Sequence, residues 1–175
     1  MIKLFFMEDN WKFTRSITKY DPAYRNEKGY YMKYEWIGFG QIGEMFEGEL
    51  LTLDSYLQTE SKYIKAAYYF FQFHKCESVI IKNLEKRHTD DYFLDDKEQL
   101  VAFFNKINEG TEILLNDLSL LIKLILRDMV WAELFCINSD EVALTFGYDF
   151  YMYFNSNVDM SDLFVKEGQL GLYVW

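Results

Sequence analysis

The stretch MVWAELFCINSDEVALTFGYDFYMYF, residues 129–154, decides the fold of this chain. It consists of two long apolar runs on either side of the turn-forming tetrapeptide NSDE at 138–141. Both runs are rich in Val, Phe, Tyr and Trp, so the pattern predicts a β-hairpin. Gly147 lies inside the second run and is a suitable position for a β-bulge. Both faces of the first run are nearly apolar, so we expect more strands and a helical layer to cover the hairpin.

The rest of the chain supplies that cover. Apolar residues at helical spacing predict helices at 52–75, 97–107 and 117–127, and the last is apolar almost all round. Short apolar runs at 2–6, 30–36, 77–84 and 170–175 are candidate strands. We therefore expect a single α+β domain spanning residues 1–175, with a mainly antiparallel sheet of about five strands and about three packed helices. Residues 7–39 show little helical period, which is typical of a functional loop or of an undetected strand.

The composition bears on the kind of partner. With 28 acidic and 18 basic residues the formal net charge is -10, which argues against binding nucleic acid or an anionic membrane through a basic patch. The charge suits a cationic partner, although it would also keep an aromatic protein in solution. There are 14 Tyr and 16 Phe, more than a core of this size needs, so we expect some of them on the surface, where they favour recognition.

Cysteine usage and hydropathy bear on location. Cys76 and Cys136 have no paired spacing and no ligand cluster around them, which predicts reduced structural thiols in a cytoplasmic protein. The apolar run at 2–7 is too short for a signal peptide, and acids follow it directly. The longest apolar stretch, 113–126, is interrupted by polar residues and predicts a buried helix rather than a membrane span.

Few residues are candidates for chemistry. His74 and His88 are the only histidines, and neither has a second ligand at zinc-site spacing, so we expect no metal and no cofactor. The glycines at 38, 40 and 43 match G-x-G-x-x-G in letters, but no βαβ unit follows. Glu60 falls within an apolar helix stripe, where it must pair with an arginine or a tyrosine hydroxyl or else mark a site. Asp149 lies among tyrosines, as either a core hydrogen-bond hub or part of a recognition surface.

Several short groups of residues are similar to one family: Lys19-Tyr20-Asp21-Pro22, Glu35-Trp36, Ile42-Gly43 with Phe46, Leu51-Thr52 with Tyr56 and Glu60, Leu126-Arg127, and Gly147-Tyr148-Asp149 with Tyr151. Together they resemble the cytosolic immunity proteins encoded beside bacterial polymorphic toxins, including toxins of contact-dependent growth inhibition. The resemblance extends over most of the chain. It implies a non-enzymatic inhibitor that binds one cognate toxin domain, often a nuclease, and blocks its active or substrate-binding surface.

Charge and aromatic content, rather than the family, suggest which residues bind the toxin. Carboxylates would take the place of phosphates against the toxin's Arg and Lys, and tyrosines would supply packing. The predicted contact residues are Asp90, Asp91, Asp95, Asp96, Glu44, Glu47, Glu49, Tyr148, Asp149 and Tyr151. Two alternatives are a small carboxylate-dependent enzyme, with Asp149 and Glu60 in one cleft, and a regulatory protein-binding module.

Overall fold

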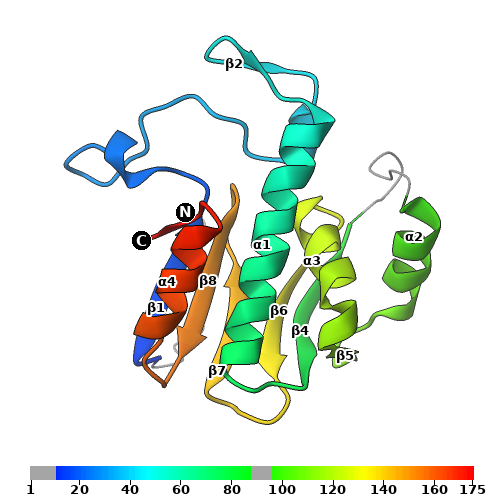
Figure 1. Ribbon diagram of the computed structural model, residues 1–175. Coiled ribbons are helices and arrows are strands. Elements are labelled where there is room, and N and C mark those ends of the chain that lie inside the picture. Colours follow the sequence, from blue (N-terminus) through cyan, green and yellow to red (C-terminus); the bar gives the residue numbers. More distant parts are fainter. Residues whose placement is uncertain (1–10, 88–95) are drawn as a thin grey trace, which may run out of the picture.

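A computed structural model describes residues 11–87 and 96–175, and within them the chain forms one seven-stranded antiparallel sheet with helices packed on it (Figure 1). The sheet order is β5-β4-β6-β7-β8-β1-β9. Its strands are β1 (Phe13–Thr18), β4 (Ser78–Lys86), β5 (Glu112–Leu114), β6 (Val130–Cys136), β7 (Val142–Phe146), β8 (Tyr151–Ser156) and β9 (Tyr173–Val174). A separate hairpin consists of β2 (Met45–Phe46) and β3 (Glu49–Leu50). The helices are α1 (Leu53–Phe73), α2 (Lys97–Lys106), α3 (Leu118–Leu126) and α4 (Ser161–Gln169).

The stretch 129–154 forms three consecutive strands, β6, β7 and β8, in the middle of the sheet. The predicted turn at 138–141 is present, but the second apolar run is divided by another turn at 147–150. There Asp149 and Phe150 both adopt positive φ, at 59° and 61°, as a tight type I′ reversal requires. Gly147 is needed for close approach rather than for a bulge, since a Cβ at that position would lie 2.8 Å from Cε2 of Tyr153.

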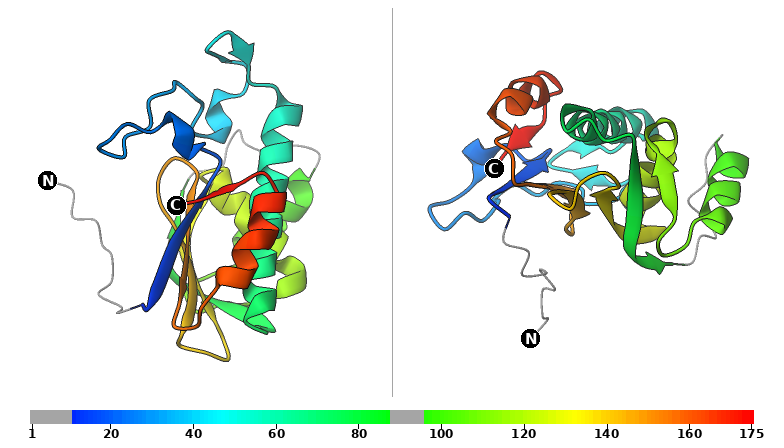
Figure 2. Two further views of the ribbon diagram at one scale, coloured as in Figure 1. Left: turned by 60° about the vertical axis from the view of Figure 1, so that its left-hand side comes forward. Right: turned by 90° about the horizontal axis from the view of Figure 1, so that it is seen from below.

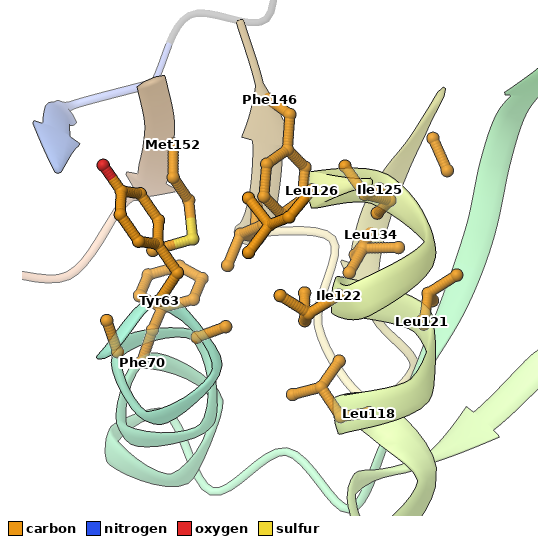
Figure 3. Close-up of a cluster of buried hydrophobic side chains, with 14 of the residues drawn as sticks. Tyr63, Phe70, Leu118, Leu121, Ile122, Ile125, Leu126, Leu134, Phe146 and Met152 are labelled. Atoms are coloured by element: carbon orange, nitrogen blue, oxygen red, sulfur yellow. The ribbon is translucent and has the colours of Figure 1, made fainter. Parts of the chain in front are cut away.

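The helices explain why one face of these strands is so apolar. Seen from below, α1, α3 and α4 lie on the same side of the sheet (Figure 2). Seven of the nine residues of α3 are buried, as its nearly all-round apolar pattern predicts. In the close-up, Tyr63 and Phe70 of α1 and Ile122 and Leu126 of α3 lie on the same side as Phe146 and Met152 of the strands (Figure 3). These contacts form the core.

The α+β class, the antiparallel sheet and the three helices predicted at 52–75, 97–107 and 117–127 are confirmed. Thr52 caps α1 in a reciprocal capping box with Ser55. The sheet has more strands than predicted, and α4 was not expected. The run at 30–36 is not a strand and contributes only an isolated bridge from Tyr31 to Arg25, while the run at 2–6 lies outside the described residues.

The cysteines differ from the prediction. Cys76 follows α1, Cys136 ends β6, and the two form a disulfide with their Cα atoms 5.7 Å apart. Because Cys136 lies opposite Val79 of β4, the antiparallel register brings the two sulfur atoms together from positions 60 residues apart. The expectation of reduced thiols was therefore wrong. Spacing along the chain carried no signal for this pairing.

Within residues 11–87 and 96–175, every helix is too short or too polar to cross a bilayer.

Candidate protein-binding surface

The β1–α1 segment, residues 19–51, is the long connection between β1 and α1, and it lies at one end of the sheet (Figure 1). Apart from two 3-10 turns and the β2–β3 hairpin it has no regular structure. Many large apolar side chains that remain exposed in the described chain belong to it: Tyr24, Tyr30, Met32, Tyr34, Ile37, Met45 and Leu50. A concentration of exposed aromatic and methionine side chains is typical of a protein-binding site.

The segment is joined to the core at its start. The buried hydroxyl of Tyr63 on α1 accepts a hydrogen bond of 2.7 Å from the backbone N–H of Lys19 and donates one of 2.6 Å to the carbonyl of Phe150. Tyr63 therefore links α1 with the end of β1 and with the β7–β8 turn. Burial raises its pKa well above the ordinary value, so the hydroxyl stays protonated and keeps its donor role.

A second anchor is the ion pair of Lys19 with Glu35, whose Nζ and Oε2 atoms are 3.1 Å apart. The same ammonium lies 4.1 Å from the ring centroids of both Tyr20 and Trp36, and the hydroxyl of Tyr31 donates to the other oxygen of Glu35. Burial lowers the pKa of Lys19, although Glu35 opposes this effect. Residues 19–36 are thus folded back onto themselves around one carboxylate.

Arg25 provides a third anchor, to the sheet. Its Nη2 donates a 2.6 Å hydrogen bond to the hydroxyl of Tyr151 on β8, and its Nη1 donates one of 2.8 Å to the carbonyl of Gly29. The guanidinium carbon lies 4.6 Å from the ring centroid of Trp175. Tyr151, one of the predicted contact residues, is therefore half-buried and already holds the β1–α1 segment in place.

Three predicted carboxylates gather on the β2–β3 hairpin. Glu44, Glu47 and Glu49 are all exposed, and the two-residue turn is formed by Glu47 and Gly48, both with positive φ. Glu47 Oε1 accepts a 3.2 Å hydrogen bond from the backbone N–H of Tyr34. This bond and the contact between the rings of Tyr34 and Phe46 join the hairpin to the part of the β1–α1 segment that precedes it.

The β7–β8 turn brings a further predicted pair to the same end of the molecule. Tyr148 is 73% exposed, and Asp149 is exposed beside it. Burial and then the charge of Asp149 raise the pKa of Tyr20, so the carboxylate lies close to the base of the β1–α1 segment. Of the two roles considered for Asp149, its position fits a recognition surface and excludes a core hydrogen-bond hub.

The remaining predicted residues are elsewhere. Asp96 precedes α2, and its carboxylate accepts from Lys123 at 2.7 Å and from Arg127 at 3.1 Å. Burial opposes ionisation of Asp96, but hydrogen bonds from these two cations lower its pKa. Asp96 is thus occupied by internal pairs, and its contact with a partner stays a prediction. Asp90, Asp91 and Asp95 lie outside the described residues.

Glu60 is paired with an arginine, one of the outcomes that its position predicted. Arg127 donates from Nε and Nη2 to the two carboxylate oxygens, each at 2.8 Å, and both side chains are almost fully buried. Glu60 is therefore enclosed by the core, whereas Asp149 lies on an outer turn. The two carboxylates do not share a cleft, which was the arrangement that an enzyme would have used.

Sequence reasoning missed the exposed side chains between Tyr24 and Leu50, apart from the glutamates. The available signal was the long irregular run of aromatic residues at 7–39, which indicated a functional loop without identifying its contacts. Among the residues that the structure describes, no three His, Cys, Asp or Glu side chains converge as a metal site would require. Comparison with models of protein families, with curated proteins and with solved structures gives no match.

Proposed function

We propose that this protein is an immunity protein that binds a cognate bacterial toxin, a cationic nuclease, and blocks its active or substrate-binding surface without performing chemistry itself. The observation that carries the proposal is the β1–α1 segment, where exposed aromatic and methionine side chains lie beside exposed glutamates. Buried aromatic anchors with a polar rim are the usual anatomy of a tight protein interface.

The charge supports a cationic partner. A nuclease holds phosphates with Arg and Lys, so its substrate surface is positive. A chain of net charge -10 is attracted to such a surface, and carboxylates form strong charge-assisted hydrogen bonds with the groups that normally hold phosphate. Glu44, Glu47, Glu49 and Asp149 are the described acids best placed to do so.

The anchoring of the segment also supports binding. A long irregular loop would lose much conformational entropy on association if it were free beforehand. Here the pair of Lys19 with Glu35 and the bond from Arg25 to Tyr151 hold residues 19–36 before any partner arrives. The surface is therefore pre-organised, which favours affinity.

The resemblance places the encounter in the bacterial cytoplasm, and we keep this location as part of the proposal. The disulfide of Cys76 with Cys136 weighs against it, because glutathione and thioredoxin keep cytosolic thiols reduced. Quenching intact cells in acid and then alkylating the denatured protein without reductant tests the location, because both cysteines are buried in the fold. Two modified cysteines agree with a cytosolic protein, and an unmodified pair removes this part of the proposal.

The main test uses the toxin domain encoded by the reading frame beside this gene. Co-expression should rescue growth, and a purified equimolar mixture should elute as one complex with the toxin's activity abolished. Separate elution with a fully active toxin would overturn the proposal. A regulatory binding module would use the same surface, and a neighbouring frame without a toxin domain would favour that alternative.

A further inference from the structure

The β2–β3 hairpin is exposed in an unusual way for a structural element. It projects from the N-terminal end of α1, beyond the end of the sheet (Figure 1). Met45 and Leu50 face each other across its two strands, and they are 56% and 54% exposed. The alternate residue Phe46 is turned inward, 6% exposed, and lies 5.2 Å from the ring of Tyr34. One face of the hairpin is thus held by the protein, and the other presents an uncovered apolar pair.

The surroundings of that pair are negative. No Lys or Arg occurs from Tyr34 to Ser61, whereas six acids do. Glu35 and Glu60 are neutralised by Lys19 and Arg127. The other four are exposed and form no ion pair within the described part of the chain: Glu44, Glu47, Glu49 and Asp54. The hairpin and the first turn of α1 therefore carry about four negative charges at neutral pH, and Lys33, which interacts electrostatically with Glu47, offsets them only in part.

The two-stranded hairpin is supported by the described part of the chain on its inner side only. Such a unit is marginally stable in water unless it packs against something else. Phe46 and Leu51, which is 3% exposed, hold its inner side, and the backbone of Leu51 bonds to Gly43 and Glu44 at its base. No described part of the chain covers the outer side, where Met45 and Leu50 are exposed, so this side is open to another molecule.

We infer that the β2–β3 hairpin is the element that enters the partner, and that it fits a groove with an apolar floor and Arg or Lys on its walls. Met45 and Leu50 pack on the floor, and the three glutamates pair with the walls. The inference rests on the proposed function and assigns the inhibitory contact to one element. A second copy of this chain does not fit the hairpin, because two surfaces of this charge repel each other, and an anionic membrane or a nucleic acid is excluded for the same reason.

The test compares two hairpin variants with two matched controls, using a catalytically inactive form of the toxin domain encoded beside the gene as the probe. The first variant, Met45→Ser with Leu50→Ser, is matched by Leu114→Ser with Ile137→Ser, a pair of exposed apolar residues at the opposite end of the sheet. The second replaces Glu44, Glu47 and Glu49 by Gln. Its control makes the same change in net charge, also at the opposite end, with Glu77→Gln, Asp140→Asn and Glu141→Gln.

Binding is measured by surface plasmon resonance at low and high salt, with circular dichroism confirming that each variant is folded. We expect the apolar variant to raise Kd by about 30-fold or more and its control to stay within about threefold of wild type. The charge variant should slow association about tenfold at low salt, while its control has a smaller effect. If all four variants bind the toxin domain as the wild type does, this inference is overturned and the proposed function still stands. Absence of wild-type binding would remove both.

Discussion

The ion pair of Arg127 with Glu60 allows a quantitative prediction. Arg127 is 1% exposed and Glu60 is 2% exposed, and they share two hydrogen bonds of 2.8 Å. Glu60→Gln keeps the shape but removes the charge, so that among the described residues Asp96 alone still places a carboxylate on the guanidinium. Breaking a buried pair lowers the free energy of unfolding by about 3–5 kcal/mol. We expect a loss near the lower end of this range, because Asp96 still pairs with Arg127. For a chain of this length, about 3 kcal/mol lowers Tm by roughly 6–12 °C.

Urea denaturation gives the free energy of unfolding, and calorimetry gives Tm. The double variant Glu60→Leu with Arg127→Met is the control, because it removes both charges and leaves Asp96 with Lys123. We expect the double variant to be more stable than Glu60→Gln alone, since it leaves no unpaired buried charge. Two results would refute this reasoning: a loss in the free energy of unfolding below about 1 kcal/mol for Glu60→Gln, or a larger loss for the double variant than for Glu60→Gln. Either would show that the two charges do not depend on each other for their burial.

Three other predictions concern single features. Replacing Cys136 by Ala should lower the free energy of unfolding by about 4 kcal/mol, given the 60-residue separation, and a urea midpoint unaffected by reductant in the wild type would contradict this. The pKa of Asp96 is lowered from its ordinary 3.8, so its stabilising effect is present above about pH 4 and is lost as pH falls through the lowered value. Asp96→Asn should therefore make the free energy of unfolding fall less steeply as the pH is lowered below about 4. An unchanged pH dependence would contradict a stabilising role for the Asp96 carboxylate. Gly147→Ala should cost about 1–3 kcal/mol, because its Cβ meets Tyr153 at 2.8 Å, and a neutral result in thermal unfolding would show that this ring moves aside freely.

Helices α1, α2 and α3 and the class of fold followed from periodicity, because burial on one side imposes the same spacing on the residues, whereas α4 was not predicted. The division of the second apolar run did not follow. A two-residue turn with positive φ normally uses Asn, Asp or Gly followed by Gly; Asp149 fits this preference, but Phe150 at the second position does not. Phe150 is held there because its ring is buried among Trp36, Tyr56 and Tyr63. Tertiary packing outweighs local preference at Phe150, so the turn could not be predicted from local residue preferences alone.

The candidate surface was predictable only in part. Net charge and excess tyrosine indicated which residue types to expect, and the glutamates at 44–49 and the turn at 148–149 lie where a partner can reach them. The anchors of the β1–α1 segment join Arg25 to Tyr151, 126 residues apart, and Lys19 to Tyr63, 44 apart. Such contacts depend on how strands and helices are arranged, and no local pattern encodes them. For the same reason the disulfide was missed.

The outermost strands have a consequence for how this protein behaves when it is concentrated. β5 has three residues and β9 has two, although the strands beside them, β4 and β1, have nine and six. An edge strand has unpaired backbone N–H and C=O groups that can bond to a strand of another molecule, and strands rich in aromatic residues are especially prone to form fibrils in this way. β5 pairs only with Ser78–Ile80 of β4, but further along β4 the backbone N–H groups of Asn83 and Leu84 donate to the carboxylate of Glu109, which leaves fewer backbone groups for an incoming strand. These features make edge-to-edge pairing less favourable, which matters for a chain with 19% aromatic residues.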